Sequence, residues 1–138
     1  MNAVIINVKD DGGNVTIPAD SEYVTQAGSY NYQLTNISKT MEQLKKHGIY
    51  VIARIVVFKD DVLAKNITHS IKYDDGTVWK DYSGSAWVDP YDEWVRQYNI
   101  EVAKQAAILG FDEIQFDYIR FPEKFSQYDI SKKYLENK

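Results

Sequence analysis

The sequence contains no cysteine, which excludes disulfide bonds, thiolate metal sites and a cysteine nucleophile. Its two histidines, His47 and His69, are far apart in the sequence and do not have the spacing of paired zinc ligands. No motif supports a serine–histidine–aspartate arrangement. The residues therefore imply no metal and no organic cofactor.

Positive charge and long apolar runs are also scarce. The 138 residues include 16 Lys and Arg against 20 Asp and Glu, so the net charge is -4 and nucleic acid is an unfavourable partner. No segment approaches the roughly 20 apolar residues of a membrane-spanning helix. Residues 1–13 lack the basic start and the apolar run of a signal peptide.

Aromatic residues, by contrast, are abundant at 14% of the chain. Many lie beside acidic residues, as in YDDGTVWKDYSGSAWVDPYDEW, residues 73–94. Aromatic faces with neighbouring hydrogen-bonding groups suit sugars, but the same residues can simply pack half-buried loops. Composition leaves both interpretations open.

The hydrophobic pattern predicts the order strand, helix, strand, long loop, helix, strand and a short terminal helix. Near-continuous apolar runs separated by helices indicate a parallel sheet in one α/β domain covering residues 1–138. Two architectures fit: a small open sheet, or part of a (β/α)₈ barrel, of which this length would hold roughly three or four strands. The expected strands are 3–8, 49–61 and 110–122, and the expected helices are 38–48, 89–110 and 131–138.

The last predicted strand, GFDEIQFDYIRFP, has an unusual polar face. Alternate residues of a strand share a face, so Glu113, Gln115 and Asp117 point the same way. The second strand carries Arg54 as a lone charge in an apolar run, and a buried guanidinium needs an anion. We therefore expect Arg54 to lie beside Asp117 and to lower its pKa.

The first strand also ends in polar residues, with Lys9 and Asp11 predicted on the face that Asn7 occupies. Three successive strands ending this way are typical of a pocket at the carboxyl ends of a parallel sheet. The alternatives are that Asp117 faces solvent on a one-sided sheet, that Arg54 extends to the surface, and that residues 9–12 form only a polar turn.

Several segments resemble a bacterial glycoside hydrolase domain family that was formerly a domain of unknown function. They are INVKDDGG, VIARIVVFKDD and the long run from DGTVWKDYSGSAWVDPYDEW to GFDEIQFDYIRFP, whose ending is the most specific part. The family is related to α-amylase-like and other (β/α)₈-barrel glycosidases. The resemblance covers nearly the whole chain and implies a partial barrel of this kind.

The resemblance implies that Asp117, at the end of barrel strand four, is a glycosidase nucleophile. A retaining enzyme needs a second carboxyl group about 5–5.5 Å away, and Glu113 lies roughly 13 Å deeper along the strand. The general acid/base is thus unassigned, and we expect this chain to be an inactive part of a longer barrel. We also expect the chain to self-associate through its exposed sheet edges. Substrate contacts are expected from Lys9, Asp11, Arg54, Trp79, Tyr82, Trp87, Gln115, Tyr118 and Arg120.

Two other functions compete with a hydrolase acting on a polysaccharide or oligosaccharide. One is a non-catalytic carbohydrate-binding barrel of a cell-surface protein, which would use the same aromatic residues. A weaker one is a domain that binds a phosphorylated ligand, for which residues 11–13 are the nearest candidate motif but too acidic. From the resemblance alone, the expected location is extracellular or on the surface of a bacterium.

Overall fold

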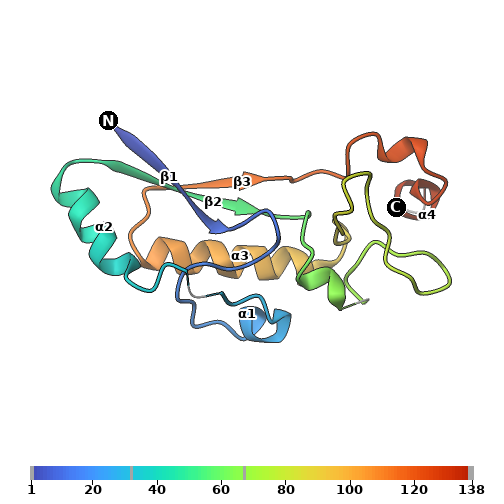
Figure 1. Ribbon diagram of the computed structural model, residues 1–138, viewed down its shortest axis with the longest axis horizontal. Coiled ribbons are helices and arrows are strands. Elements are labelled where there is room, and N and C mark those ends of the chain that lie inside the picture. The colour runs from blue at the N-terminus through green and yellow to red at the C-terminus, as the bar shows by residue number, and fades with distance from the viewer. Residues whose placement is uncertain (1, 32, 67, 137–138) are drawn as a thin grey trace.

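The structure is a computed structural model that describes residues 2–31, 33–66 and 68–136. Three parallel strands form one sheet in the order β1-β2-β3 (Figure 1). They are β1 (Ala3–Lys9), β2 (Tyr50–Val56) and β3 (Glu113–Asp117). The predicted parallel α/β architecture is confirmed, although each strand after the first is shorter than its apolar pattern suggested.

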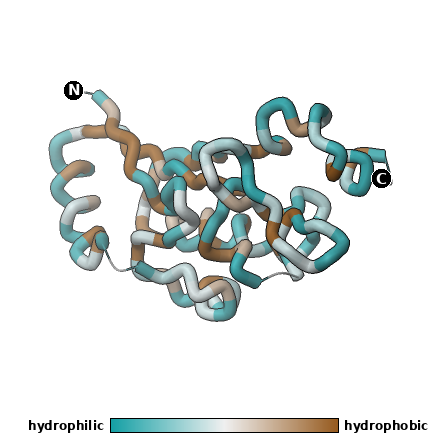
Figure 2. Tube along the Cα trace, turned by 45° about the vertical axis from the view of Figure 1, so that its right-hand side comes forward, coloured by the Kyte–Doolittle hydropathy of each residue, from teal (hydrophilic) through white to brown (hydrophobic). Residues whose placement is uncertain are grey.

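The two faces of the sheet differ in what covers them. Val51, Ala53 and Ile55 of β2 are fully buried on the face along which α3 (Glu93–Ile108) runs (Figure 1). The opposite face carries exposed or half-buried side chains, including Ile5 and Arg54. Figure 2 shows that apolar residues are concentrated in the strands, as a sheet with helices packed on it requires.

The helices begin and end near the predicted positions, with one correction; residues 137–138 of the last predicted helix lie outside the described residues. The cap of α3 is Asp92, whose Oδ1 accepts hydrogen bonds from the backbone N–H groups of Trp94 (2.8 Å) and Val95 (3.4 Å). Asp89, where the predicted helix begins, instead accepts a hydrogen bond from the backbone N–H of Tyr91 in the preceding turn. The other helices are α1 (Glu22–Ala27), which the sequence did not predict, α2 (Ile37–Lys46) and α4 (Ser131–Leu135).

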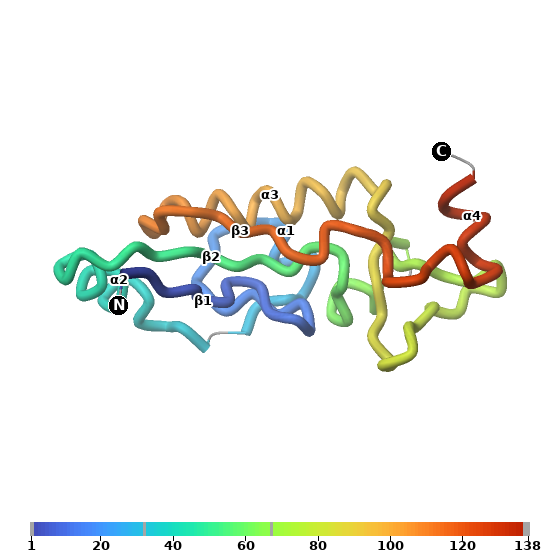
Figure 3. The backbone as a smooth tube through the Cα atoms, turned by 90° about the horizontal axis from the view of Figure 1, so that it is seen from above, coloured from blue at the N-terminus to red at the C-terminus, as the bar shows by residue number. Residues whose placement is uncertain are grey.

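The carboxyl ends of the three strands lie at the same end of the molecule. Figure 3 shows the loop after β2 and the segment after β3 extending together beyond that end. The loop contains a small hairpin, with Lys72 bridged to Val78 and Gly76 at the turn. It packs on the C-terminal segment through Trp79, whose ring meets the edges of Phe125 and Tyr128. The short helices here are η1 (Leu63–Lys65) and η2 (Phe125–Gln127).

Candidate active site

Asp117 ends β3 and is held by Arg54 of the neighbouring strand, as the sequence predicted. Its Oδ2 accepts two hydrogen bonds from Arg54, from Nε at 2.9 Å and from an η nitrogen at 2.7 Å. Its Oδ1 accepts a third from the backbone N–H of Tyr118 at 2.8 Å. The Arg54 guanidinium and this N–H hold the pKa of Asp117 below its ordinary value, so the carboxylate is ionised at neutral pH.

Arg54 also reaches the first strand and thereby joins all three. Its other η nitrogen donates to Asp11 Oδ1 at 2.8 Å and to Asn7 Oδ1 at 3.2 Å. The register explains this contact, because Asn7 of β1 and Gln115 of β3 both lie opposite Arg54. The guanidinium is thus shared between two carboxylates, as expected for a cation in a strand that is otherwise apolar.

Lys9 lies on the other side of the sheet from this network, which corrects its predicted position. The register slips between Asn7 and Lys9, and this irregularity turns Lys9 toward α3. There it is fully buried, with Nζ 2.7 Å from Asp60 Oδ2 and 3.0 Å from Asn99 Oδ1. Lys9 therefore cannot reach a substrate at the sheet face.

The Lys9–Asp60 pair instead fixes the loops that follow β1 and β2. Burial lowers the pKa of Lys9 and raises that of Asp60, and the attraction between the two charges opposes both changes. Asp60 also accepts from the backbone of Leu63 at 2.8 Å. Gly13 packs so closely that a Cβ there would lie 2.0 Å from Asp60 Oδ1.

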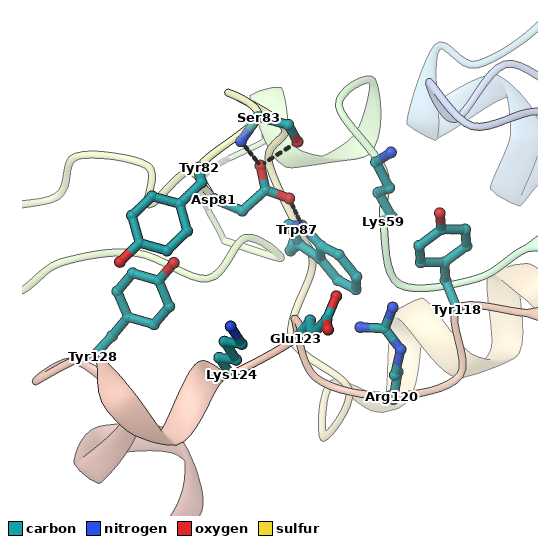
Figure 4. Close-up of a pocket in the computed structure, with 10 residues that line it drawn as sticks. All are labelled: Lys59, Asp81, Tyr82, Ser83, Trp87, Tyr118, Arg120, Glu123, Lys124 and Tyr128. Carbon is teal, nitrogen blue, oxygen red and sulfur yellow. Dashed lines mark hydrogen bonds between the residues drawn. The ribbon is translucent and has the colours of Figure 1, made fainter.

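A cavity of about 360 Å³ opens beyond the end of β3, next to Asp117 along the chain (Figure 4). Tyr118 and Arg120 line it from the segment after β3, and Trp87 lines it from the long loop. Arg120 lies over the rings of Trp87 and Tyr118, at 5.6 and 5.3 Å from their centroids. Its charge also contributes to the lowered pKa of Asp117, which links this cavity to the carboxylate electrostatically.

The predicted aromatic contacts divide into buried and accessible ones. Trp79 is only 1% exposed and belongs to the core, so its predicted role in contacting sugar does not fit its position. Trp87 is 3% exposed, and its Nε1 donates to Asp81 at 2.8 Å, so little more than an edge meets the cavity. Tyr82, in contrast, is 90% exposed at the cavity wall.

Three predicted contact residues lie at the surface in different places. Gln115 is exposed on the sheet face that Arg54 occupies, whereas Tyr118 and Arg120 line the cavity. Tyr118 has φ +53°, a left-handed conformation that non-glycine residues seldom adopt, and this turn directs the chain away from the sheet after Asp117. Such outliers are concentrated at functional sites.

Sequence reasoning missed much of the cavity wall. Lys59 comes three residues after the end of β2, so the rule that placed Arg54 and Asp117 at the carboxyl ends of strands could have found it. Glu123 and Lys124 come after Pro122, where no periodicity indicates direction. The remaining missed lining residues are Asp81, Ser83 and Tyr128.

Within the described part of the chain, no three His, Cys, Asp or Glu side chains are grouped as a metal site would need. Nor is any described helix both long and apolar enough to cross a membrane.

The whole sequence, residues 1–138, matches the family described as "Putative glycosyl hydrolase domain". The chain belongs to this family. A hypothetical protein from Ruminiclostridium thermocellum ATCC 27405 has a similar crystal structure, with 39% identity and a TM-score of 0.82. The match covers 90% of this chain and 65% of that one, so this chain spans somewhat less than two thirds of its solved relative.

The domain also resembles the cycloalternan-degrading enzyme from Trueperella pyogenes, with 22% identity and a TM-score of 0.52 over 84% of this chain and 20% of that enzyme. That enzyme has also been solved in complex with a covalent intermediate. At this identity the likeness concerns the fold alone, and it supports the interpretation of the parallel sheet and its helices as part of a (β/α)₈ barrel. Among curated proteins, no match was found.

Proposed function

We propose that this domain supplies the nucleophile of a retaining glycoside hydrolase that acts on a polysaccharide or oligosaccharide. The observation that carries the proposal is the ionised Asp117 at the carboxyl end of β3, where barrel enzymes place their chemistry. Membership of a glycosyl hydrolase family supports it independently.

In the proposed reaction an Asp117 oxygen attacks the anomeric carbon of the sugar. The glycosidic bond breaks as the new carbon–oxygen bond forms, and the departing oxygen takes a proton from a general acid. Water then releases the sugar from Asp117, with the same group acting as base. Glu113 does not suit that second role, since it begins β3 and its carboxylate accepts from the Tyr50 hydroxyl at 3.3 Å.

The test is hydrolysis of a panel of polysaccharides by this chain and by a full-length protein that contains it. Asp117→Asn should lower kcat by at least about a thousandfold. Asp20→Asn, at an exposed position outside the site, is the matched control and should leave kcat unchanged. Mass spectrometry should find a slowly hydrolysing substrate attached to the peptide that contains Asp117. An unaltered rate in Asp117→Asn would rule out the assignment.

A second candidate function is carbohydrate binding without turnover. It is favoured by the hydrogen bonding of Asp117, because both carboxylate oxygens already have protein partners, as in a structural ion pair. Glycan binding by the full-length protein, with no hydrolysis in any variant, would select this function. Location outside the cell or on its surface stays a prediction in either case.

A further inference from the structure

We propose that the cavity beyond β3 binds an anionic substituent of a saccharide, a carboxylate, sulfate or phosphate oxyanion carried on a sugar ring. The saccharide part of this inference rests on the proposed function. The anionic part rests on the composition and geometry of the cavity wall.

The wall is richer in positive charge than the chain as a whole. It carries three cations, Lys59, Arg120 and Lys124, against two acids, whereas the complete sequence has a net charge of -4. None of the three cations forms an ion pair with another described residue; the ion pairs of the described chain lie elsewhere. An oxyanion that enters the cavity can therefore bind these cations without first breaking an ion pair.

One of the two acids, Asp81, keeps its charge, but protein donors already occupy its carboxylate oxygens. Asp81 Oδ1 accepts from Ser83 N, Ser83 Oγ and Ser85 N at 2.7–3.0 Å, and Oδ2 accepts from Trp87 Nε1. Partial burial opposes ionisation, but these donors hold the pKa of Asp81 below its ordinary value. The lone pairs of Asp81 face the protein. Glu123 is the other acid of the wall, and no described hydrogen bond engages its carboxylate.

Two of the three cations, Arg120 and Lys59, lie against aromatic rings. Arg120 lies against two rings and donates to the Phe121 carbonyl at 3.1 Å, and Lys59 lies 5.3 Å from the centroid of Tyr118. Lys124 has φ +57°, and Figure 4 shows its side chain directed from the C-terminal segment into the cavity. Arg120 and Lys59, which lie against rings, lose little conformational freedom when an anion binds.

The rest of the wall suits a sugar ring better than a bare ion. Tyr82 and Tyr128 lie side by side with centroids 5.4 Å apart, and Tyr82 is almost fully exposed. Aromatic faces with hydroxyl groups at one end bind the apolar faces of sugars. The volume of about 360 Å³ lies within the range of small-ligand sites, about 300–1,000 Å³.

The test compares matched charged and neutral oligosaccharides by isothermal titration calorimetry. One pair is an oligogalacturonate and its methyl ester; a second is a sulfated oligosaccharide and its desulfated form; inorganic sulfate and phosphate test the ion alone. At least one charged member should bind about tenfold or more tightly than its neutral partner, and this preference should decrease as salt rises.

Variants then assign the preference to the cavity. Arg120→Gln and Lys124→Gln should each weaken the preference for the charged oligosaccharide. In the double variant, the affinities for the charged and neutral members of a pair should differ by no more than about twofold. Lys46→Gln, at an exposed position on α2, is the control and should preserve it. If either cavity variant loses its native circular dichroism, Lys59→Gln replaces it.

Equal affinity within both pairs would overturn the inference, as would a preference that survives in the double variant. Inorganic ions that bind as tightly as the oligosaccharides would overturn the saccharide part. These outcomes are separate from those for Asp117. A charge preference without turnover supports this cavity even if the nucleophile assignment fails, and hydrolysis of neutral glycans alone supports the nucleophile and contradicts the cavity proposal.

Discussion

Arg54 is the residue on which the geometry of the site depends. It contacts Asp117 through two nitrogens and Asp11 through the third, so its position sets both carboxylates relative to the sheet. A lysine could not reproduce this arrangement, because its ammonium is a single point of charge without the planar fork of guanidinium.

We expect the Arg54–Asp117 pair to make stability depend on pH. The folded pKa of Asp117 is lowered, so the pair contributes above the unfolded pKa of about 3.9 and its contribution is lost as pH falls below it. Since the Asp117 side chain is 44% exposed, we expect the pair to contribute at most about 1 kcal/mol to the free energy of unfolding. Urea unfolding of wild type and Asp117→Asn should differ at pH 6 and converge near pH 2. A difference that does not change with pH would contradict this explanation.

Gly13 provides a second prediction at this scale. Its φ is +97°, and an added Cβ would contact the buried Asp60 carboxylate. Gly13→Ala should therefore lower the free energy of unfolding by at least about 3 kcal/mol, from strain and from disturbance of the buried ion pair. Gly76→Ala has a similar φ of +86° but open space around it, and should cost only about 1–2 kcal/mol. Equal losses would mean that Asp60 can move aside.

At the scale of elements, the irregular register at the end of β1 decides which polar residues reach the site. Strict alternation predicts Lys9 on the same face of the sheet as Asn7. The extra residue turns the Lys9 side chain to the other face of the sheet, where it contacts Asp60 and Asn99. No local pattern in the sequence signals the irregularity, and the ion pair that accompanies it joins residues far apart in the sequence.

The long loop between β2 and α3 contains both structural and accessible aromatic residues, and substitution should separate them. Trp79→Ala should lower the free energy of unfolding by about 3–5 kcal/mol, because the ring fills the core against Phe125 and Tyr128. Tyr82→Ala should alter stability by no more than about 0.5 kcal/mol and should instead weaken glycan binding. Urea unfolding and calorimetric titration measure the two effects. A stable Trp79→Ala protein would contradict the core assignment.

At the scale of the whole molecule, the sheet presents an incompletely covered surface. In the described part of the chain, β1 and β3 each pair with β2 on one side only. Ile5 of β1 and Phe116 of β3 are 58% and 43% exposed. Open edges and exposed apolar residues favour pairing with another chain.

We therefore expect this domain to self-associate. Light scattering should give a mass above the 16.0 kDa of a single chain, rising with concentration. Ile5→Lys should shift the equilibrium toward the monomer, because it replaces an exposed apolar side chain of an edge strand with a charge. The exposed Lys46→Gln is a suitable control. A monodisperse monomer at all concentrations would disprove the expectation.

The predictable part of this molecule follows from strand periodicity. The apolar run around Arg54 and the alternation up to Asp117 were sufficient to predict the parallel sheet and the ion pair across it. The cavity was harder, because Lys59, Asp81 and Lys124 come from loops whose direction depends on packing between segments distant in sequence. A similar tertiary cause buried Trp79 while leaving Tyr82, three residues later, in solvent.

The Arg54 network also determines when the site can form. Arg54 is 43 residues from Asp11 and 63 from Asp117 along the chain, so neither pairing arises from local structure. During synthesis the ribosome makes Arg54 and Asp11 long before Asp117, and the two earlier residues can pair first. The carboxylate of Asp117 gains its partner only when β3 docks on β2. Completion of the site therefore coincides with the closing of the longest loop in the sheet, which is a slow step for any parallel topology.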